Sequence, residues 1–129
     1  MTREHVPLFD TTRRDGQQAP GVDFSVDDKL AVIDLLDSLG LDYIEGGYPG
    51  ANPTDTALFA EERKMKATFT AFGMVKRAGR SVSHDRDLQD LLNAKSPALC
   101  FVSNSWDYNV RLALVCHTRE TLESLPTEV

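Results

Sequence analysis

Several features that mark common protein classes are scarce or absent in this sequence. Cys100 and Cys116 are its only cysteines and do not form a CxxC pair, which argues against a disulfide framework or a zinc knuckle. No apolar run approaches the ~18 residues of a membrane-spanning helix, and the opening segment MTREHVPLFD lacks the apolar stretch of a signal peptide. Basic residues are outnumbered, 14 against 20 acidic ones, and the net charge of -6 repels the phosphates of nucleic acids. We therefore expect a cytoplasmic protein that binds neither nucleic acid nor membranes.

The sequence does contain a regular alternation of strand-like and helix-like segments. Short apolar runs, typical of buried strands, lie at 6–10, 42–47, 67–73 and 98–103. Segments with helical signals lie at 26–39, 53–66, 87–94 and 118–125, and a polar loop is expected at 11–23. Strands that alternate with helices in this way predict a parallel α/β sheet with right-handed crossovers. Two architectures fit the pattern: a doubly wound sheet, or half of a (β/α)8 barrel, which takes about 250 residues in full.

Charged residues stand at the ends of the first two expected strands, where parallel βα folds place their active sites. Arg14 and Asp15 follow the first strand and Glu45 closes the second, so the carboxylates should face the same end of the sheet. A carboxylate can bind a hard divalent cation, and an arginine can hold a substrate carboxylate or stabilise an enolate oxygen. Spacing alone leaves a structural alternative open, in which Arg14 and Asp15 form a loop salt bridge and Asp10 caps a turn.

Two longer stretches carry a more specific signal. The segments LFDTTRRDGQQAPGVDFSVDDK and YIEGGYPGANPTD resemble the signature of the isopropylmalate, homocitrate and citramalate synthase family, and GGYPGANP with a later SWD resembles its citramalate branch. The resemblance covers essentially the whole chain. It implies that residues 1–129 are a truncated catalytic domain, the N-terminal half (about four βα units) of a TIM barrel related to pyruvate carboxyltransferases and hydroxymethylglutaryl-CoA lyases.

The same resemblance implies an acyltransferase that condenses acetyl-CoA with a 2-keto acid. The citramalate-type motifs favour pyruvate as the keto acid and (R)-citramalate as the product, in isoleucine biosynthesis. Isopropylmalate synthesis, homocitrate synthesis and cleavage by a lyase of the hydroxymethylglutaryl-CoA type are alternatives. A non-catalytic half-barrel that serves as an assembly module is an alternative from another class.

Individual residues also take roles from the resemblance. Asp15 would bind a divalent metal ion (Mg²⁺, Mn²⁺ or Zn²⁺), and Arg14 would be a catalytic residue that contacts the keto-acid oxygen and the enolate-like transition state. Gln18 would bind the substrate, and Glu45 would be a catalytic residue that supports the metal and the arginine. Arg13 stands where the family usually has leucine, so either arginine could point into the site.

The chain departs from the family pattern in its histidines. Family members complete the metal site with an H-x-H pair, whereas His5, His84 and His117 lie far apart in this sequence. The resemblance therefore implies an incomplete metal site and an inactive fragment. Half a barrel would also have two open sheet edges and an apolar inner face. We expect the chain to form a homodimer, or to flatten into an open sheet with helices on both faces.

Overall fold

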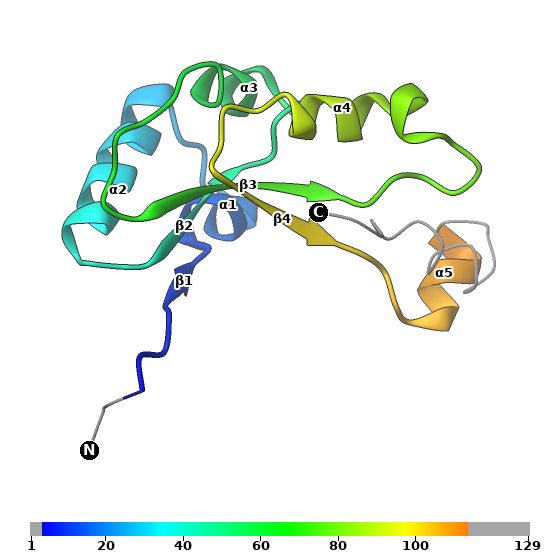
Figure 1. The fold of residues 1–129 in the computed structure, drawn as a ribbon, viewed down its shortest axis with the longest axis horizontal. Helices are drawn as coiled ribbons and strands as arrows, with labels where there is room; N and C mark the ends of the chain where they lie inside the picture. Colours follow the sequence, from blue (N-terminus) through cyan, green and yellow to red (C-terminus); the bar gives the residue numbers. More distant parts are fainter. Residues whose placement is uncertain (1–3, 114–129) are drawn as a thin grey trace.

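The structure is a computed structural model that describes residues 4–113. Its strands are β1 (Phe9–Asp10), β2 (Tyr43–Gly47), β3 (Thr68–Met74) and β4 (Ala98–Val102). Its helices are α1 (Thr12–Asp15), α2 (Val26–Ser38), α3 (Pro53–Leu58), α4 (Arg86–Leu92) and α5 (Asp107–Ala113), with 3-10 turns η1 (Gly16–Gln18) and η2 (Val82–His84). Neighbouring strands are parallel, in the order β1-β2-β3-β4 (Figure 1).

The strand order and the placement of the helices identify the architecture. The order does not reverse within residues 4–113, and α2, α3 and α4 lie on the same face of the sheet (Figure 1). A doubly wound sheet reverses its order and carries helices on both faces, whereas consecutive parallel strands with their helices on one side are typical of a (β/α)8 barrel. The prediction of a partial TIM barrel is therefore confirmed. The flattened sheet with helices on both faces is wrong for the described residues, because right-handed crossovers that add strands in one direction keep their helices on one face.

α2 begins and ends where the sequence signals predict. The Ser25 hydroxyl accepts a hydrogen bond from Asp28 N (3.2 Å), and the Asp28 side chain accepts one from Ser25 N (3.0 Å), which completes a capping box. Beyond the other end, Gly40 has a φ of +78°, a left-handed conformation that glycine adopts without strain. These two signals fix the length of the helix that covers β2.

α3 is shorter than predicted. It begins after the N-cap Asn52, as expected, but ends at Leu58 instead of continuing to Lys66. The carbonyl of Phe59 accepts a hydrogen bond from Lys95 N (3.0 Å). In a continuing helix this carbonyl would accept from the N–H of Arg63, so Lys95 replaces the helical donor. A contact remote in sequence thus ends a helix that local propensity would continue.

Other boundaries also differ from the pattern. The segment 11–23 is not wholly a loop, because it contains α1 and η1, and β1 keeps only two of the residues in 6–10. The pattern did not predict α5, and the helix expected at 118–125 lies outside the described residues. The remaining strands and α4 agree with the predicted segments to within two residues.

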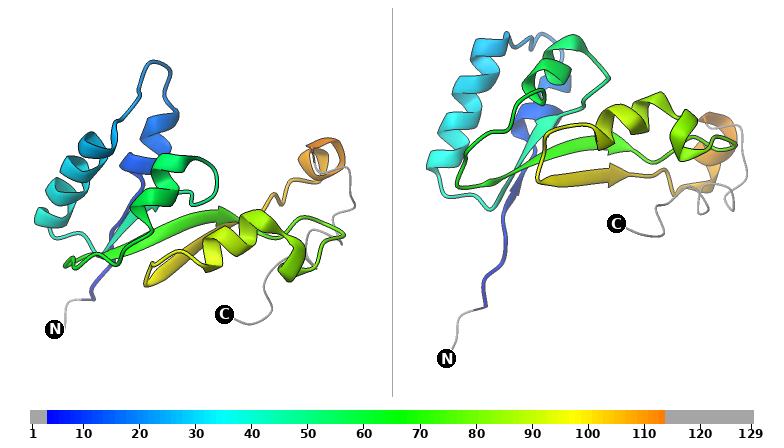
Figure 2. Two further views of the ribbon diagram at one scale, coloured as in Figure 1. Left: turned by 90° about the horizontal axis from the view of Figure 1, so that it is seen from above. Right: turned by 45° about the horizontal axis from the view of Figure 1, so that its top comes forward.

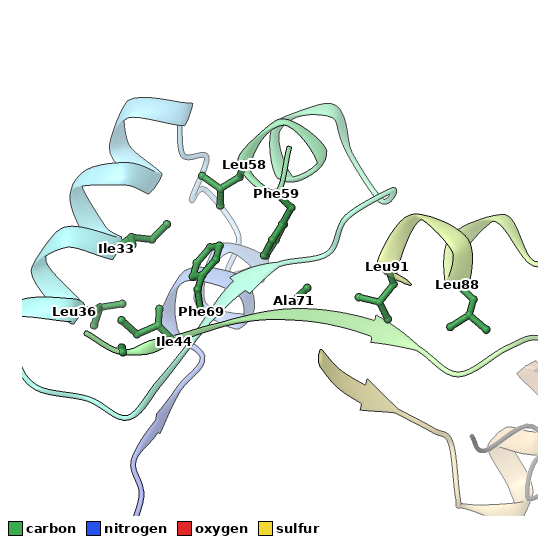
Figure 3. Close-up of a cluster of buried hydrophobic side chains, with 10 residues drawn as sticks. Ile33, Leu36, Ile44, Leu58, Phe59, Phe69, Ala71, Leu88 and Leu91 are labelled. Atoms are coloured by element: carbon green, nitrogen blue, oxygen red, sulfur yellow. The ribbon is translucent and has the colours of Figure 1, made fainter. Parts of the chain in front are cut away.

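A single apolar core lies between the sheet and the helices (Figure 3). Ile33 and Leu36 of α2, Leu58 of α3, and Leu88 and Leu91 of α4 point toward the strands. The strands contribute Ile44, Phe69 and Ala71, and Phe59 stacks on Phe69 with ring centroids 4.8 Å apart. These nine side chains are at most 8% exposed, so they bury the helix-side face of the sheet.

The opposite face of the sheet carries a different set of side chains, because successive residues of a strand point to opposite faces. Glu45 of β2, Phe72 of β3 and Cys100 of β4 belong to this inner face, next to core residues that point the other way. α5 lies beyond the end of β4 and apart from the row of α2 to α4 (Figure 2). None of the helices in residues 4–113 has the length and apolar character to span a membrane.

Candidate active site

The short helix α1 brings two candidate residues to the end of the sheet. The Asp10 carboxylate accepts hydrogen bonds from Thr12 N (3.0 Å) and Thr12 Oγ1 (2.9 Å), which turns the chain into the helix as soon as β1 ends. Asp15 N then donates to the carbonyl of Thr11 (2.8 Å). Both parts of the structural alternative are therefore observed, since Asp10 caps a turn and Arg14 forms an ion pair with Asp15 (3.0 Å). The same turn presents Arg14 to the neighbouring strand β2.

Arg14 lies at the centre of the site. Its Nε donates to Glu45 Oε2 (2.7 Å), its Nη1 donates to Asp15 Oδ1 (3.0 Å), and its Cζ lies 4.1 Å from the centroid of the Phe72 ring. The structure thus brings together three of the residues singled out from the sequence. Their exposure differs: the side chain of Glu45 is 1% exposed, that of Arg14 19% and that of Asp15 59%. Glu45 is the buried counterion, and Asp15 is the carboxylate that a ligand can reach.

Arg13 points away from this site, which settles which arginine faces it. Its side chain is 0% exposed, and its Nη2 donates to Asp55 Oδ1 at 3.0 Å. Lys29 Nζ, also buried, donates to the same oxygen at 2.9 Å. Two buried cations therefore share one carboxylate, and Arg13 Nε and Nη1 have no hydrogen-bond partner among the described residues.

Asp55 joins several segments that surround the site. Its carboxylate also accepts hydrogen bonds from Tyr48 N (3.1 Å) and from the Asn52 side-chain amide (3.1 Å), so it links the β2–α3 loop to α1 and α2. Burial alone raises the pKa of the Asp55 carboxyl, but the hydrogen bonds from Lys29 and Tyr48 and the charge of Arg13 outweigh burial and lower it below the usual value. Asp55 is therefore a buried anion whose hydrogen bonds hold α1, α2 and the β2–α3 loop together next to the site.

Gly47 makes room for this arrangement. A Cβ at this position would lie 2.6 Å from Arg13 Nη1 and 2.6 Å from the Asp55 carboxyl carbon, and the φ of Gly47 is +138°, which disfavours other residues. The strand register also shifts between Glu45 and Gly47. Gly47, the second of the two glycines that end β2, is thus required by the close approach of charged side chains.

Two residues of the site did not stand out from the sequence. The ring of Phe72 packs against the guanidinium of Arg14, and the thiol of Cys100 lies beside the carboxylate of Glu45. Burial raises the pKa of the Cys100 thiol, and the neighbouring Glu45 carboxylate raises it further, so these surroundings disfavour a nucleophilic thiolate. The signal that could have found them is the two-residue alternation of β3 and β4, which puts both on the face of Glu45.

The other candidates from the sequence form no hydrogen bond with this cluster in the described part of the chain. Gln18 ends η1 with an exposed side chain that has no hydrogen-bond partner within residues 4–113. His5 hydrogen-bonds Asp42 (2.8 Å), His84 hydrogen-bonds Ser81 (2.7 Å), and His117 lies outside the described residues. In the described part of the chain, no three Asp, Glu, His or Cys side chains gather as a metal site would require. Among the clustered residues, Asp15 is the exposed carboxylate, and only one of its oxygens accepts a hydrogen bond within residues 4–113.

The geometry of Arg14 suits the binding of a negatively charged oxygen. Two of its nitrogens and one face of its guanidinium are engaged, while Nη2 has no acceptor within the part of the chain that the structure describes. The free donors of a charged, pre-oriented guanidinium can stabilise an oxyanion or hold a carboxylate. The buried Glu45 holds it in place without competing from the solvent side.

Comparison with known proteins gives these residues a family context. The model of the HMGL-like family matches residues 5–98. The (R)-citramalate synthase of Aquifex aeolicus is 41% identical over 125 residues, which cover 95% of this chain and 24% of that protein. The (R)-citramalate synthase of Streptomyces coelicolor is 43% identical (83% of this chain, 21% of that protein), and the 2-isopropylmalate synthase of Methylorubrum populi is 39% identical (64% and 17%).

The fold comparison agrees with the topology. The crystal structure of the HMG-CoA lyase of Bacillus subtilis matches with a TM-score of 0.66 at 24% identity, over 93% of this chain and 40% of that chain. At this identity the likeness supports the fold alone. The chain spans about a quarter of the length of the curated relatives that it matches. Because the family model covers most of the described residues in an unbroken stretch, the chain belongs to the HMGL-like family.

Proposed function

We propose that the protein that contains this chain condenses acetyl-CoA with a 2-keto acid, and that the keto acid is pyruvate. The observation that carries the proposal is the guanidinium of Arg14, held by Glu45 and Asp15 at the end of the parallel strands, with Nη2 unbonded in the part of the chain that the structure describes. Such a group suits a 2-keto acid, in which the reacting carbon bears the keto oxygen and is bonded to a carboxylate. Hydrolysis of the thioester by water would then release CoA and the product (R)-citramalate, and acetyl-CoA and pyruvate would be met in the cytoplasm.

The choice of pyruvate rests on how far the similarity extends. Five (R)-citramalate synthases are 35–43% identical over 83–95% of this chain. Three 2-isopropylmalate synthases have comparable identity, 37–40%, but match only 61–65% of it. The likeness to citramalate synthases therefore extends over segments that the likeness to isopropylmalate synthases does not reach. This favours citramalate synthesis over the branched-chain alternative.

In this proposal each residue of the site has a defined task. Arg14 binds the keto-acid oxygen and stabilises the negative charge that develops there as the carbanion of acetyl-CoA attacks. Glu45 fixes the orientation of Arg14 through the 2.7 Å hydrogen bond. Gln18, exposed on η1, contacts the bound substrate. Asp15 offers an oxygen ligand to a divalent cation, which when bound would polarise the keto group as a Lewis acid.

Asp15 fits a metal only in part. One exposed carboxylate supplies a hard oxygen ligand of the kind that divalent cations prefer, but a stable site needs several such ligands. Glu45 is already engaged by Arg14, and His5 and His84 are bound elsewhere. The remaining ligands would come from beyond the described residues. A homodimer, expected from the sequence, stays a prediction that sedimentation can test.

The activity is tested with the whole protein that the gene encodes. Release of free CoA thiol is followed with acetyl-CoA and pyruvate, and a branched 2-keto acid and 2-ketoglutarate are compared as competing substrates. We expect turnover with pyruvate to exceed the others, and mass spectrometry should identify citramalate. Turnover restricted to the branched acid would instead make the protein an isopropylmalate synthase, and thioester cleavage without condensation would make it a lyase.

The residue roles are tested by two substitutions with matched controls. Arg14→Ala should lower kcat by about 10²-fold or more, because an oxyanion-stabilising charge acts on the transition state. Asp15→Asn should abolish turnover and weaken Mn²⁺ binding measured by calorimetry. Arg86→Ala and Asp34→Asn, at exposed positions of α4 and α2, remove the same groups outside the site. Near-normal turnover of Arg14→Ala would contradict the proposed role.

A further inference from the structure

Phe72 lies directly beneath the candidate catalytic arginine. The Cζ atom of Arg14 stands over the Phe72 ring, 4.1 Å from its centroid, well within the range of a cation–π contact. Phe72 belongs to β3, whereas Arg14 belongs to α1, which follows β1. The contact therefore spans β2, and it comes from a strand that supplies no charged group to the site. The ring is half-buried on the inner face and not part of the apolar core under the helices.

Tyr48 holds the Phe72 ring in turn. The two rings meet edge to face, with centroids 5.5 Å apart and an interplanar angle of 81°. Tyr48 is the residue directly after β2, and its backbone N–H is anchored on Asp55 at 3.1 Å. The loop that follows β2 and the strand β3 therefore support Arg14 together.

The three contacts of Arg14 restrict different motions. The hydrogen bonds to Glu45 and Asp15 lie at the edges of the guanidinium and fix its rotation in its own plane, but they leave its tilt free. A ring packed against one face fixes the tilt. Within residues 4–113, no hydrogen bond engages Nη2 and no second aromatic ring packs on Arg14, so a ligand could approach from that side. Removal of the ring would leave both hydrogen bonds possible but would no longer aim the free donors at one point.

We propose that Phe72 is a positioning residue, which sets the tilt of Arg14 through its π face. Its effect on catalysis rests on the function proposed above, whereas its effect on Arg14 itself does not. Phe72 touches no reacting atom in this proposal and acts only through the arginine. The electrostatic part of the contact distinguishes it from simple space filling, because it depends on the negative potential of the ring face.

Fluorinated phenylalanines at position 72 provide the first test. Each added fluorine weakens the negative ring face with little change in volume, so log(kcat/KM) for the keto acid should fall progressively. We expect a loss of about fivefold for the trifluorinated ring and about tenfold for Phe72→Leu, while the KM for acetyl-CoA stays unchanged. The control is the same series at Phe101 of β4, whose ring is equally half-buried but packs on the helix side of the sheet. A flat series at position 72, or the same fall at both positions, would overturn the proposal.

A second measurement does not depend on catalysis. Phenylglyoxal modifies arginine side chains, and peptide mass spectrometry gives the labelling rate of Arg14 in the whole protein. Phe72→Leu should raise this rate about fivefold relative to wild type, and Phe101→Leu should leave it unchanged. If the wild type condenses no keto acid but this difference is found, the proposed function fails and the positioning role stands. Equal labelling of Arg14 in all three proteins would overturn the positioning role whatever the activity.

Discussion

Replacing Asp55 with asparagine should destabilise the protein far more than replacing either of its cationic partners. Among residues 4–113, Asp55 is the one anion that accepts hydrogen bonds from Arg13 (3.0 Å) and Lys29 (2.9 Å), and all three side chains are at most 7% exposed. Asparagine has almost the same shape but no charge. Asp55→Asn would therefore leave two buried cations without a counterion. Removing one partner of a buried ion pair in this way costs about 3–5 kcal/mol of unfolding free energy.

Arg13→Leu should behave very differently. The change loses one charged hydrogen bond, worth about 1.5–3 kcal/mol, but it also removes two buried nitrogens that lack partners, each of which costs about 1–3 kcal/mol. Lys29 and Asp55 would remain as a neutral pair. We therefore expect the unfolding free energy of Arg13→Leu to lie within about 1 kcal/mol of the wild-type value or above it. This agrees with the leucine that the family usually carries at this position.

Urea unfolding followed by circular dichroism measures both changes, with the m value as a check that each variant loses the same structure. Asp87→Asn is the matched control, since Asp87 pairs with Arg77 at 2.6 Å on the surface and its loss should cost at most about 1 kcal/mol. An equal loss of unfolding free energy in Arg13→Leu and Asp55→Asn would contradict this prediction. In that case the two cations would not be redundant partners of one carboxylate.

Three further changes follow from the same structure. Gly46→Ala should cost about 1–3 kcal/mol in a denaturation series, because a Cβ would overlap the Phe69 ring and lie 2.8 Å from that of Phe59; an unchanged midpoint would show that the rings can move aside. Ser25→Ala should cost about 1 kcal/mol by loss of the capping box, and Ser25→Asp should restore most of it. Because the pKa of Asp55 is lowered in the folded state, its stabilisation is fully present above the unfolded value of about 3.9 and is lost as the pH falls through the lower folded value. The stability difference between wild type and Asp55→Asn, measured from pH 7 downward, should therefore stay constant until about pH 4 and then shrink; a decline that starts near neutral pH would assign it to another group.

The sequence was sufficient for features that depend on local patterns. The capping residues Ser25 and Asn52 marked the starts of two helices, and the glycine after α2 marked its end. The placement of Arg14 and Glu45 together also followed, because in a parallel sheet every strand ends at the same side. Their convergence is observed, whereas their catalytic roles stay predictions.

Features that depend on the register between strands could not be found in this way. The alternation within β3 and β4 shows which of their residues share a face, but it does not show which of them lie beside Glu45. That depends on the register in which β3 pairs with β2 and β4 with β3, and no local pattern encodes it. The end of α3 depends on Lys95, nearly forty positions away from where the helix stops. The sequence could not show which of Arg13 and Arg14 faces the site, because that depends on the hydrogen bond from Arg13 to Asp55. In the sequence, Asp55 looks like an ordinary acidic residue in the first turn of a helix.

The strand order has a consequence for how the chain acquires its fold. Each strand pairs with the one made just before it, with partners such as Phe9 and Tyr43, or Thr70 and Ala98, about 30 positions apart. No strand has to wait for a distant segment before it can dock. During synthesis on the ribosome, each βα unit can settle on the edge left by its predecessor, so the sheet can grow in the direction of translation. Arg14 and Glu45 belong to the units of β1 and β2, so they can meet before β3 and β4 are made.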